Sequence, residues 1–152
     1  MPGPVRMPEV GTVFRTRGET VTRASIVEFA SRYDPQGIHT DEAAARGGFF
    51  GELIASGWQT AVLTMRLVIE MDVLEGPPMI GLEVRSMRFE APVRPGDVIH
   101  AEATIRSTRR TRSGHGVMTL GVRTFNGEGT LVLSQEWVVL ATGGGERGEP
   151  GA

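Results

Sequence analysis

The sequence contains no cysteine and no lysine. The absence of cysteine excludes disulfide bonds, thiolate metal sites and cysteine nucleophiles. All 16 basic residues are arginine, which excludes a P-loop, a lysine-bound pyridoxal phosphate, a Schiff-base aldolase and a serine–lysine hydrolase, because each needs an ammonium group. The 3 histidines, His39, His100 and His115, are too widely spaced for a histidine-rich zinc site. We therefore predict no metal site.

The chain also lacks a strong excess of charge and a long hydrophobic run. A formal net charge of −2 offers no electrostatic attraction to nucleic acid or to an anionic membrane, so neither is expected as a partner. The longest uncharged stretch, residues 53–65, is shorter than the roughly 18 residues that span a bilayer, so it predicts a core helix. No secretory leader is recognisable, and a cytoplasmic location is the expectation.

The remaining composition is that of one soluble globular domain. The chain has 152 residues, of which 39% are hydrophobic and 22% charged. Residues 1–9 are rich in proline and residues 142–152 in glycine, so neither segment can bury enough apolar surface to offset the entropy of ordering. We expect a flexible N-terminal segment at 1–9, a single domain at 10–141 and a flexible tail at 142–152.

The first half of the domain has mainly helical patterns. After a short strand at 10–16, Thr22 is a candidate N-cap for a helix whose apolar stripe includes Ile26 and Phe29, and which ends at Asp34 because Pro35 follows. The next segment, QGIHT, reads as a loop, and DEAAAR as a short capped helix. The pattern of residues 52–72 predicts a long helix that is apolar on nearly every face, as expected of a helix wrapped by other elements.

The second half has the patterns of β-strands. Apolar and polar residues alternate from Ile99 to Arg106, and similar runs occupy residues 80–90, 117–125 and 131–140. The apolar phase shifts near Arg85-Ser86, which indicates a bulge, and Asn126-Gly127 is a hairpin signal. One strand, a helical segment and four antiparallel strands predict an α+β fold in which the sheet curls over the long helix.

Reactive side chains are densest at residues 33–41. Pro35 and Gly37 prevent a continuous helix there, and a turn of this kind can aim the Asp34 carboxylate and the His39 imidazole at one point, where both could hold a water molecule. The dipole of the helix that follows disfavours a charged imidazole, which suits His39 to act as a neutral base. By spacing alone the alternative stays open that Asp34 caps a turn and His39 is a buried structural histidine.

Two longer stretches carry a family resemblance. The run FASRYDPQGIHTDEAAARGGFFGELIASGWQTAVLTMRL resembles the hydratase motif of the MaoC-like dehydratases, which include the (R)-specific enoyl-CoA hydratases. The later run GLEVRSMRFEAPVRPGDVIHAEATI resembles the stretch in which that family's sheet follows its central helix. The similarity extends over roughly residues 10–140. It implies a single hot-dog fold, an antiparallel sheet wrapped around a long central helix, and a homodimer or higher homo-oligomer.

The resemblance also implies the roles of particular residues. By position, Asp34 and His39 are the catalytic pair that binds the reacting water, and the backbone N–H of Gly57 is the oxyanion donor that polarises the thioester carbonyl. Gln36, Ser56 and Trp58 are candidate substrate-binding residues. Gln36 stands where many members have asparagine, and Gly37 where proline or another bulky residue is common. No cofactor is implied, because coenzyme A enters only as part of the acyl-CoA thioester substrate.

We therefore expect a hydro-lyase that adds water to, or removes it from, a 2-enoyl-CoA and its 3-hydroxyacyl-CoA product. An acyl-CoA thioesterase is a second possibility, in which Glu52 would supply the carboxylate. A third is a non-catalytic subunit that binds acyl groups, against which the intact Asp34–His39 pair argues. Four arginines within residues 106–112 could bind the phosphates of coenzyme A or simply form a solvated hairpin.

Overall fold

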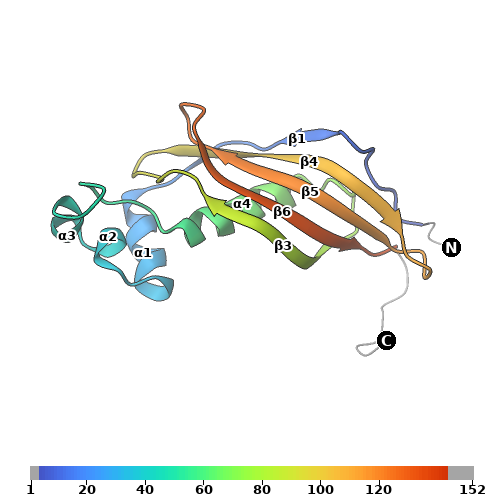
Figure 1. Cartoon of the computed structure of the whole chain (residues 1–152), viewed down its shortest axis with the longest axis horizontal. Coiled ribbons are helices and arrows are strands. Elements are labelled where there is room, and N and C mark those ends of the chain that lie inside the picture. The colour runs from blue at the N-terminus through green and yellow to red at the C-terminus, as the bar shows by residue number, and fades with distance from the viewer. Residues whose placement is uncertain (1–3, 144–152) are drawn as a thin grey trace.

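An antiparallel sheet dominates the computed structural model, which describes residues 4–143. The strand order is β1-β4-β5-β6-β3, and a short β2 also pairs with β4. Figure 1 shows α4 along one face of this sheet and three shorter helices beyond one of its ends. The elements are β1 Val13–Arg15, β2 Glu19–Thr20, α1 Arg23–Tyr33, α2 Gly37–Thr40, α3 Glu42–Arg46, α4 Gly57–Glu70, β3 Met79–Phe89, β4 Val98–Arg110, β5 Gly116–Phe125 and β6 Leu131–Ala141.

The core lies where the sheet meets α4. In β4 the alternating residues Ile99, Ala101, Ala103 and Ile105 are all fully buried, as their period of two predicts. They pack in clusters with apolar residues of the neighbouring strands, such as Leu120. This burial against a central helix confirms the predicted α+β arrangement. None of the helices within residues 4–143 is long and apolar enough to cross a membrane.

Local signals set the helices before the site. Thr22 caps α1 by accepting a hydrogen bond from the Ser25 N–H, and α1 ends at Asp34, as predicted. Asp41 caps α3 in the same way. The predicted loop QGIHT is instead a helical turn, α2, because the Asp41 N–H reaches back to the Gly37 carbonyl at 3.0 Å.

The long helix begins five positions later than residues 52–72 predict. Residues 52–56 lie outside the helix, because the N–H of Ile54 donates to Ile38 and that of Ala55 donates to Val93. Ser56 is the N-cap of α4, which ends at Glu70. Tertiary hydrogen bonds therefore replace the helical bonds that the apolar pattern suggested.

Other details of the sheet and termini test the sequence predictions. The bulge is present: the β3–β6 register shifts between Arg85 and Arg88, and Ser86 has a positive φ of 52°. The β5–β6 hairpin forms around Asn126, whose side chain accepts from the Glu128 N–H. The flexibility expected of residues 1–9 stays a prediction, and Val5 within this segment is buried in the core. Most of the predicted tail, residues 144–152, lies outside the described residues.

One face of α4 is not covered, contrary to the expected full wrapping. Val62, Met65 and Ile69 on this helix are each about half exposed, at 47%, 51% and 48%. The neighbouring strand β3 pairs with β6 and lies at the end of the strand order, so its other edge is open within residues 4–143. Leu82 and Val84 of β3 are more than half exposed. The chain thus presents an apolar helix face beside an unpaired strand edge.

Candidate active site

The chain turn after α1 brings Asp34 and His39 together. Asp34 is the C-cap of α1 and His39 lies on α2. The Oδ2 atom of Asp34 is 3.3 Å from the Nε2 atom of His39, and both side chains are largely buried. The expected convergence of these two groups is therefore present, although a helical turn rather than a loop produces it.

A backbone carbonyl defines which nitrogen of His39 carries the proton. The Nδ1 atom lies 2.8 Å from the carbonyl oxygen of Ile54. A carbonyl oxygen can only accept, so Nδ1 must be the protonated donor. In the neutral ring Nε2 is then unprotonated and presents its lone pair toward Asp34. Two acceptors facing each other suit a water molecule that donates one hydrogen to each.

Hydrogen bonds keep the Asp34 carboxyl ionised. The Gln36 side-chain amide donates to Oδ1 at 2.6 Å, and the Ser56 hydroxyl donates to Oδ2 at 2.7 Å. These two bonds hold the pKa of the Asp34 carboxyl below its ordinary value, against the opposing effect of burial. Gln36 is exposed and serves the carboxylate here, so the structure places it beside Asp34 and not on the cavity wall.

Ser56 connects the carboxylate to the start of α4. Its hydroxyl oxygen also accepts the N–H of Trp58 at 3.3 Å, and the residue is fully buried. It is absent from the cavity wall, so the structure does not support the predicted contact with substrate. The hydroxyl instead positions Asp34 while it caps the helix.

Gly57 is the first residue of α4, and its N–H finds no acceptor among residues 4–143. A free N–H at a helix N-terminus can stabilise a negatively charged oxygen. A side chain here would also collide with a neighbour that sequence analysis missed. A Cβ atom at this position would lie 2.4 Å from Cδ1 of Phe89, whose ring packs edge-on against Trp58 at a centroid distance of 5.7 Å.

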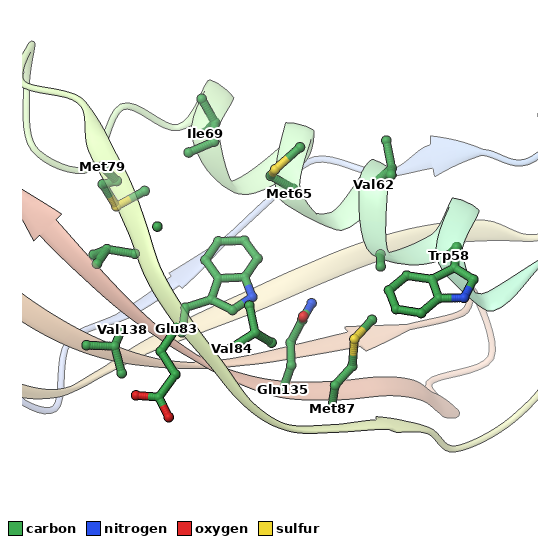
Figure 2. A pocket seen from close by; sticks show the side chains of 14 residues that line it. Trp58, Val62, Met65, Ile69, Met79, Glu83, Val84, Met87, Gln135 and Val138 are labelled. Atoms are coloured by element: carbon green, nitrogen blue, oxygen red, sulfur yellow. The ribbon is translucent and has the colours of Figure 1, made fainter. Parts of the chain in front are cut away.

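A cavity of about 450 Å³ joins these groups, with Asp34, His39 and Gly57 on its wall. A second, mainly apolar cavity of about 480 Å³ lies between α4, β3 and β6. Trp58 lines both cavities. Figure 2 shows the second cavity, with Val62, Met65 and Ile69 projecting from α4 along its upper side. The cavity that holds Asp34 and His39 and the more strongly apolar cavity therefore share one wall.

The remaining candidates lie elsewhere. Glu52 is about half exposed, forms an ion pair with Arg94, and lines neither cavity. Of the arginine-rich segment, Arg110 donates to the carbonyl of Val5, and the Arg106 side chain packs over Gly121. Within residues 4–143, no three side chains of His, Cys, Asp or Glu gather where a metal ion could bind.

Comparison with known proteins agrees with this geometry. The family model for the MaoC like domain matches residues 6–126. The chain belongs to the MaoC-like dehydratase family. Uncharacterized protein YdeM of Bacillus subtilis is 33% identical over 131 residues, covering 86% of this chain and 93% of YdeM.

Solved structures of MaoC-like proteins have the same fold. The MaoC-like dehydratase of Rhodospirillum rubrum is 33% identical, with a TM-score of 0.81 over 91% of this chain and 96% of that one. The (R)-hydratase from A. caviae involved in PHA biosynthesis is 30% identical, with a TM-score of 0.73 over 87% and 96%. The predicted hot-dog fold is thereby confirmed.

Two parts of this MaoC-like site were not predicted from sequence. The carbonyl of Ile54 lies 15 positions from His39, and backbone atoms carry no sequence signal of their own. Phe89 comes from the far end of β3, after the whole of α4. Its aromatic side chain at a strand end is an ordinary feature, so only the folded chain reveals that it packs against Gly57.

Proposed function

We propose that this protein is a hydro-lyase that adds water reversibly across the double bond of a 2-enoyl-CoA to give a 3-hydroxyacyl-CoA. The observation that carries the proposal is the convergence of three groups on one cavity. The Asp34 carboxylate and Nε2 of His39 lie 3.3 Å apart, and the backbone N–H of Gly57 is on the same wall. Such a site binds a water, removes a proton from it and stabilises an enolate.

The path of each proton in the reaction follows from the hydrogen bonds of the site. A water donates one hydrogen to Asp34 and the other to Nε2 of His39. As the water oxygen bonds to C3 of the enoyl group, Nε2 takes the second hydrogen, and the C2=C3 π electrons move toward the thioester oxygen beside Gly57 N–H. The resulting enolate then takes that proton from His39 at C2. Dehydration is the reverse of these steps.

The two cavities divide the substrate according to polarity. The thioester and the double bond would occupy the cavity that holds Asp34, and the acyl chain would continue past Trp58 into the apolar cavity. Every proton and every stabilising dipole in this scheme comes from the chain or the water. Coenzyme A therefore takes part only as the handle of the substrate, and the reaction needs no resident cofactor.

We further propose that the active unit is a homodimer formed through the open edge of β3. Pairing two such edges would satisfy both rows of free backbone groups and bury the exposed face of α4. Leu82→Lys in β3 is expected to lower the mass measured by light scattering from dimer to monomer. Val10→Lys introduces the same charge at another exposed apolar residue, which precedes β1 at the opposite edge of the sheet, and should leave the dimer intact. A monomeric natural protein with full turnover would contradict the proposal.

The decisive experiment is a turnover screen on 2-enoyl-CoA thioesters of increasing chain length. We expect loss of the absorbance of the conjugated double bond, with water incorporated at C3 in labelled solvent. Release of free coenzyme A is followed in parallel with a thiol reagent, for which this cysteine-free chain gives no background. Thiol release without hydration would establish the thioesterase instead. No turnover of any enoyl thioester would leave the non-catalytic acyl-binding subunit.

A further inference from the structure

The apolar cavity contains one polar side chain that the proposed mechanism does not use. Gln135 lies on β6 and lines the cavity, and only 8% of it is exposed. Its Nε2 atom is buried without a hydrogen-bond partner. Figure 2 shows the amide at the tip of a side chain that rises from β6 toward α4, between Val84 and Met87. A buried amide without a partner costs folding free energy, so its position calls for a function.

The sequence context makes this glutamine unusual. Its neighbours two positions away on β6, Leu133 and Trp137, are both buried, so Gln135 occupies a position of the apolar series. It also lies opposite the bulge in β3, because Glu136 pairs with Arg85 and Ser134 pairs with Arg88. The bulge leaves Gln135 without a direct partner in the β3 register. The side chain of Gln135 lines the cavity beside this gap in the register.

We propose that Gln135 recognises an oxygen atom in the acyl chain of the substrate, so that this protein prefers an oxygen-bearing acyl group over a plain alkyl chain. The inference rests on the proposed function for the occupant of the cavity, which is the acyl chain that continues from the thioester past Trp58. An amide offers a donor and an acceptor according to its rotation, so a carbonyl, ether or hydroxyl oxygen can pair with it.

The charges around the cavity restrict the oxygen to an uncharged group. Glu83 is the one charged residue among those that line it, and it is acidic. Glu83 is paired with Arg85 at 3.0 Å, so a carboxylate on the acyl chain would meet no free cation among the lining residues and would lose its hydration without compensation. The remaining wall is mostly aliphatic, aromatic and methionine side chains, which suit the carbon atoms on either side of the oxygen.

The test measures binding of saturated acyl-CoA thioesters, which have no double bond to hydrate. Calorimetry compares a straight alkyl chain with a series of analogues of the same length. In each analogue an ether oxygen replaces one methylene, and the position of this oxygen along the chain differs from one analogue to the next. We expect the ether analogue with its oxygen at one particular position, or at either of two adjacent positions, to bind about tenfold or more tightly than the alkyl parent. The reason is that a site that pairs with a polar group discriminates against a ligand lacking it. Equal or weaker binding of every ether analogue would overturn the inference.

Variants of two glutamines separate recognition from burial. Gln135→Met keeps the length of the side chain and should abolish the preference for oxygen, with tighter binding of the alkyl parent. Gln59→Met is the matched control, because Gln59 is also buried with an unpaired oxygen but lines neither cavity. The control should retain the preference. A preference that survives Gln135→Met would refute the role of Gln135.

The same measurements distinguish this inference from the proposed function. Oxygen-dependent binding without hydration of any enoyl thioester would sustain the role of Gln135 and remove the hydro-lyase. A lower mass of Gln135→Met in light scattering, together with no oxygen preference in the natural protein, would show that the amide pairs with a second copy of the chain and would overturn the inference. Should Gln135→Met not fold, the ether scan on the natural chain decides the matter.

Discussion

Ser56→Ala tests the link between the helix start and the Asp34 carboxylate. The substitution removes an N-cap, worth about 1 kcal/mol, and a hydrogen bond to a carboxylate, worth roughly 1.5–3 kcal/mol. Water recovers part of the second contribution, because the Asp34 side chain keeps 18% of its surface exposed. We therefore expect the free energy of unfolding to fall by about 2 kcal/mol, which lowers the Tm by about 4–8 °C for a chain of this size.

The pH dependence of that loss identifies its source. The pKa of Asp34 is depressed in the folded protein, so the carboxylate contributes stability above its unfolded pKa, and this contribution is lost as the pH falls through the folded value. The deficit of Ser56→Ala should therefore be full at pH 7 and begin to shrink below about pH 4. Glycine is tolerated as an N-cap, so Ser56→Gly should lose little stability through capping. Its deficit in the free energy of unfolding should therefore consist mostly of the pH-dependent part.

Urea unfolding at pH 7, 4 and 3, a series that reaches below the pH at which the deficit should begin to shrink, measures these differences, and the rate profile provides a second readout. Without the Ser56 donor the pKa of Asp34 rises toward its ordinary value, so the acidic limb of the hydration profile should move to higher pH. A deficit below about 0.5 kcal/mol at pH 7 would refute the reasoning. A deficit that is the same at every pH, with an unshifted acidic limb, would mean that the hydroxyl only caps the helix.

Three further predictions concern the site. Asp34→Asn and His39→Gln should each lower the hydration rate at least about 10²-fold with an intact fold. The double variant should lose much less activity than the product of the two single losses. Near-normal turnover of either single variant would contradict the joint role of Asp34 and His39. Gly57→Ala should lower kcat/KM because the new Cβ displaces the Phe89 ring. Adding Phe89→Ala should restore part of the lost kcat/KM. If the effects of the two substitutions are strictly additive in this double-mutant cycle, the steric explanation is wrong. Glu52→Gln should leave hydration within about twofold, since surface ion pairs contribute little, and a large loss would favour the thioesterase.

Much of the local structure was predictable because its causes are local. The caps at Thr22 and Asp41, the end of α1 at Asp34 and the alternation in β4 each depend on residues within a few positions of one another. The convergence of Asp34 and His39 was predictable for the same reason, since the two residues are only five positions apart. The start of α4 was not, because contacts of residues 54 and 55 with distant backbone groups displace the helical hydrogen bonds.

The sequence by itself determined the fold class, the reactive pair and the exclusion of cysteine and lysine chemistry, because composition, period and short spacing carry that information. Only the tertiary structure decided how the pair works. The proton on Nδ1 of His39 is placed by a carbonyl 15 residues away, and Gly57 is required by a ring on β3. The unpaired amide of Gln135 likewise depends on which side chains surround it. Hydrogen-bond partners and steric neighbours are properties of positions in space, and residues distant in the chain meet only after folding.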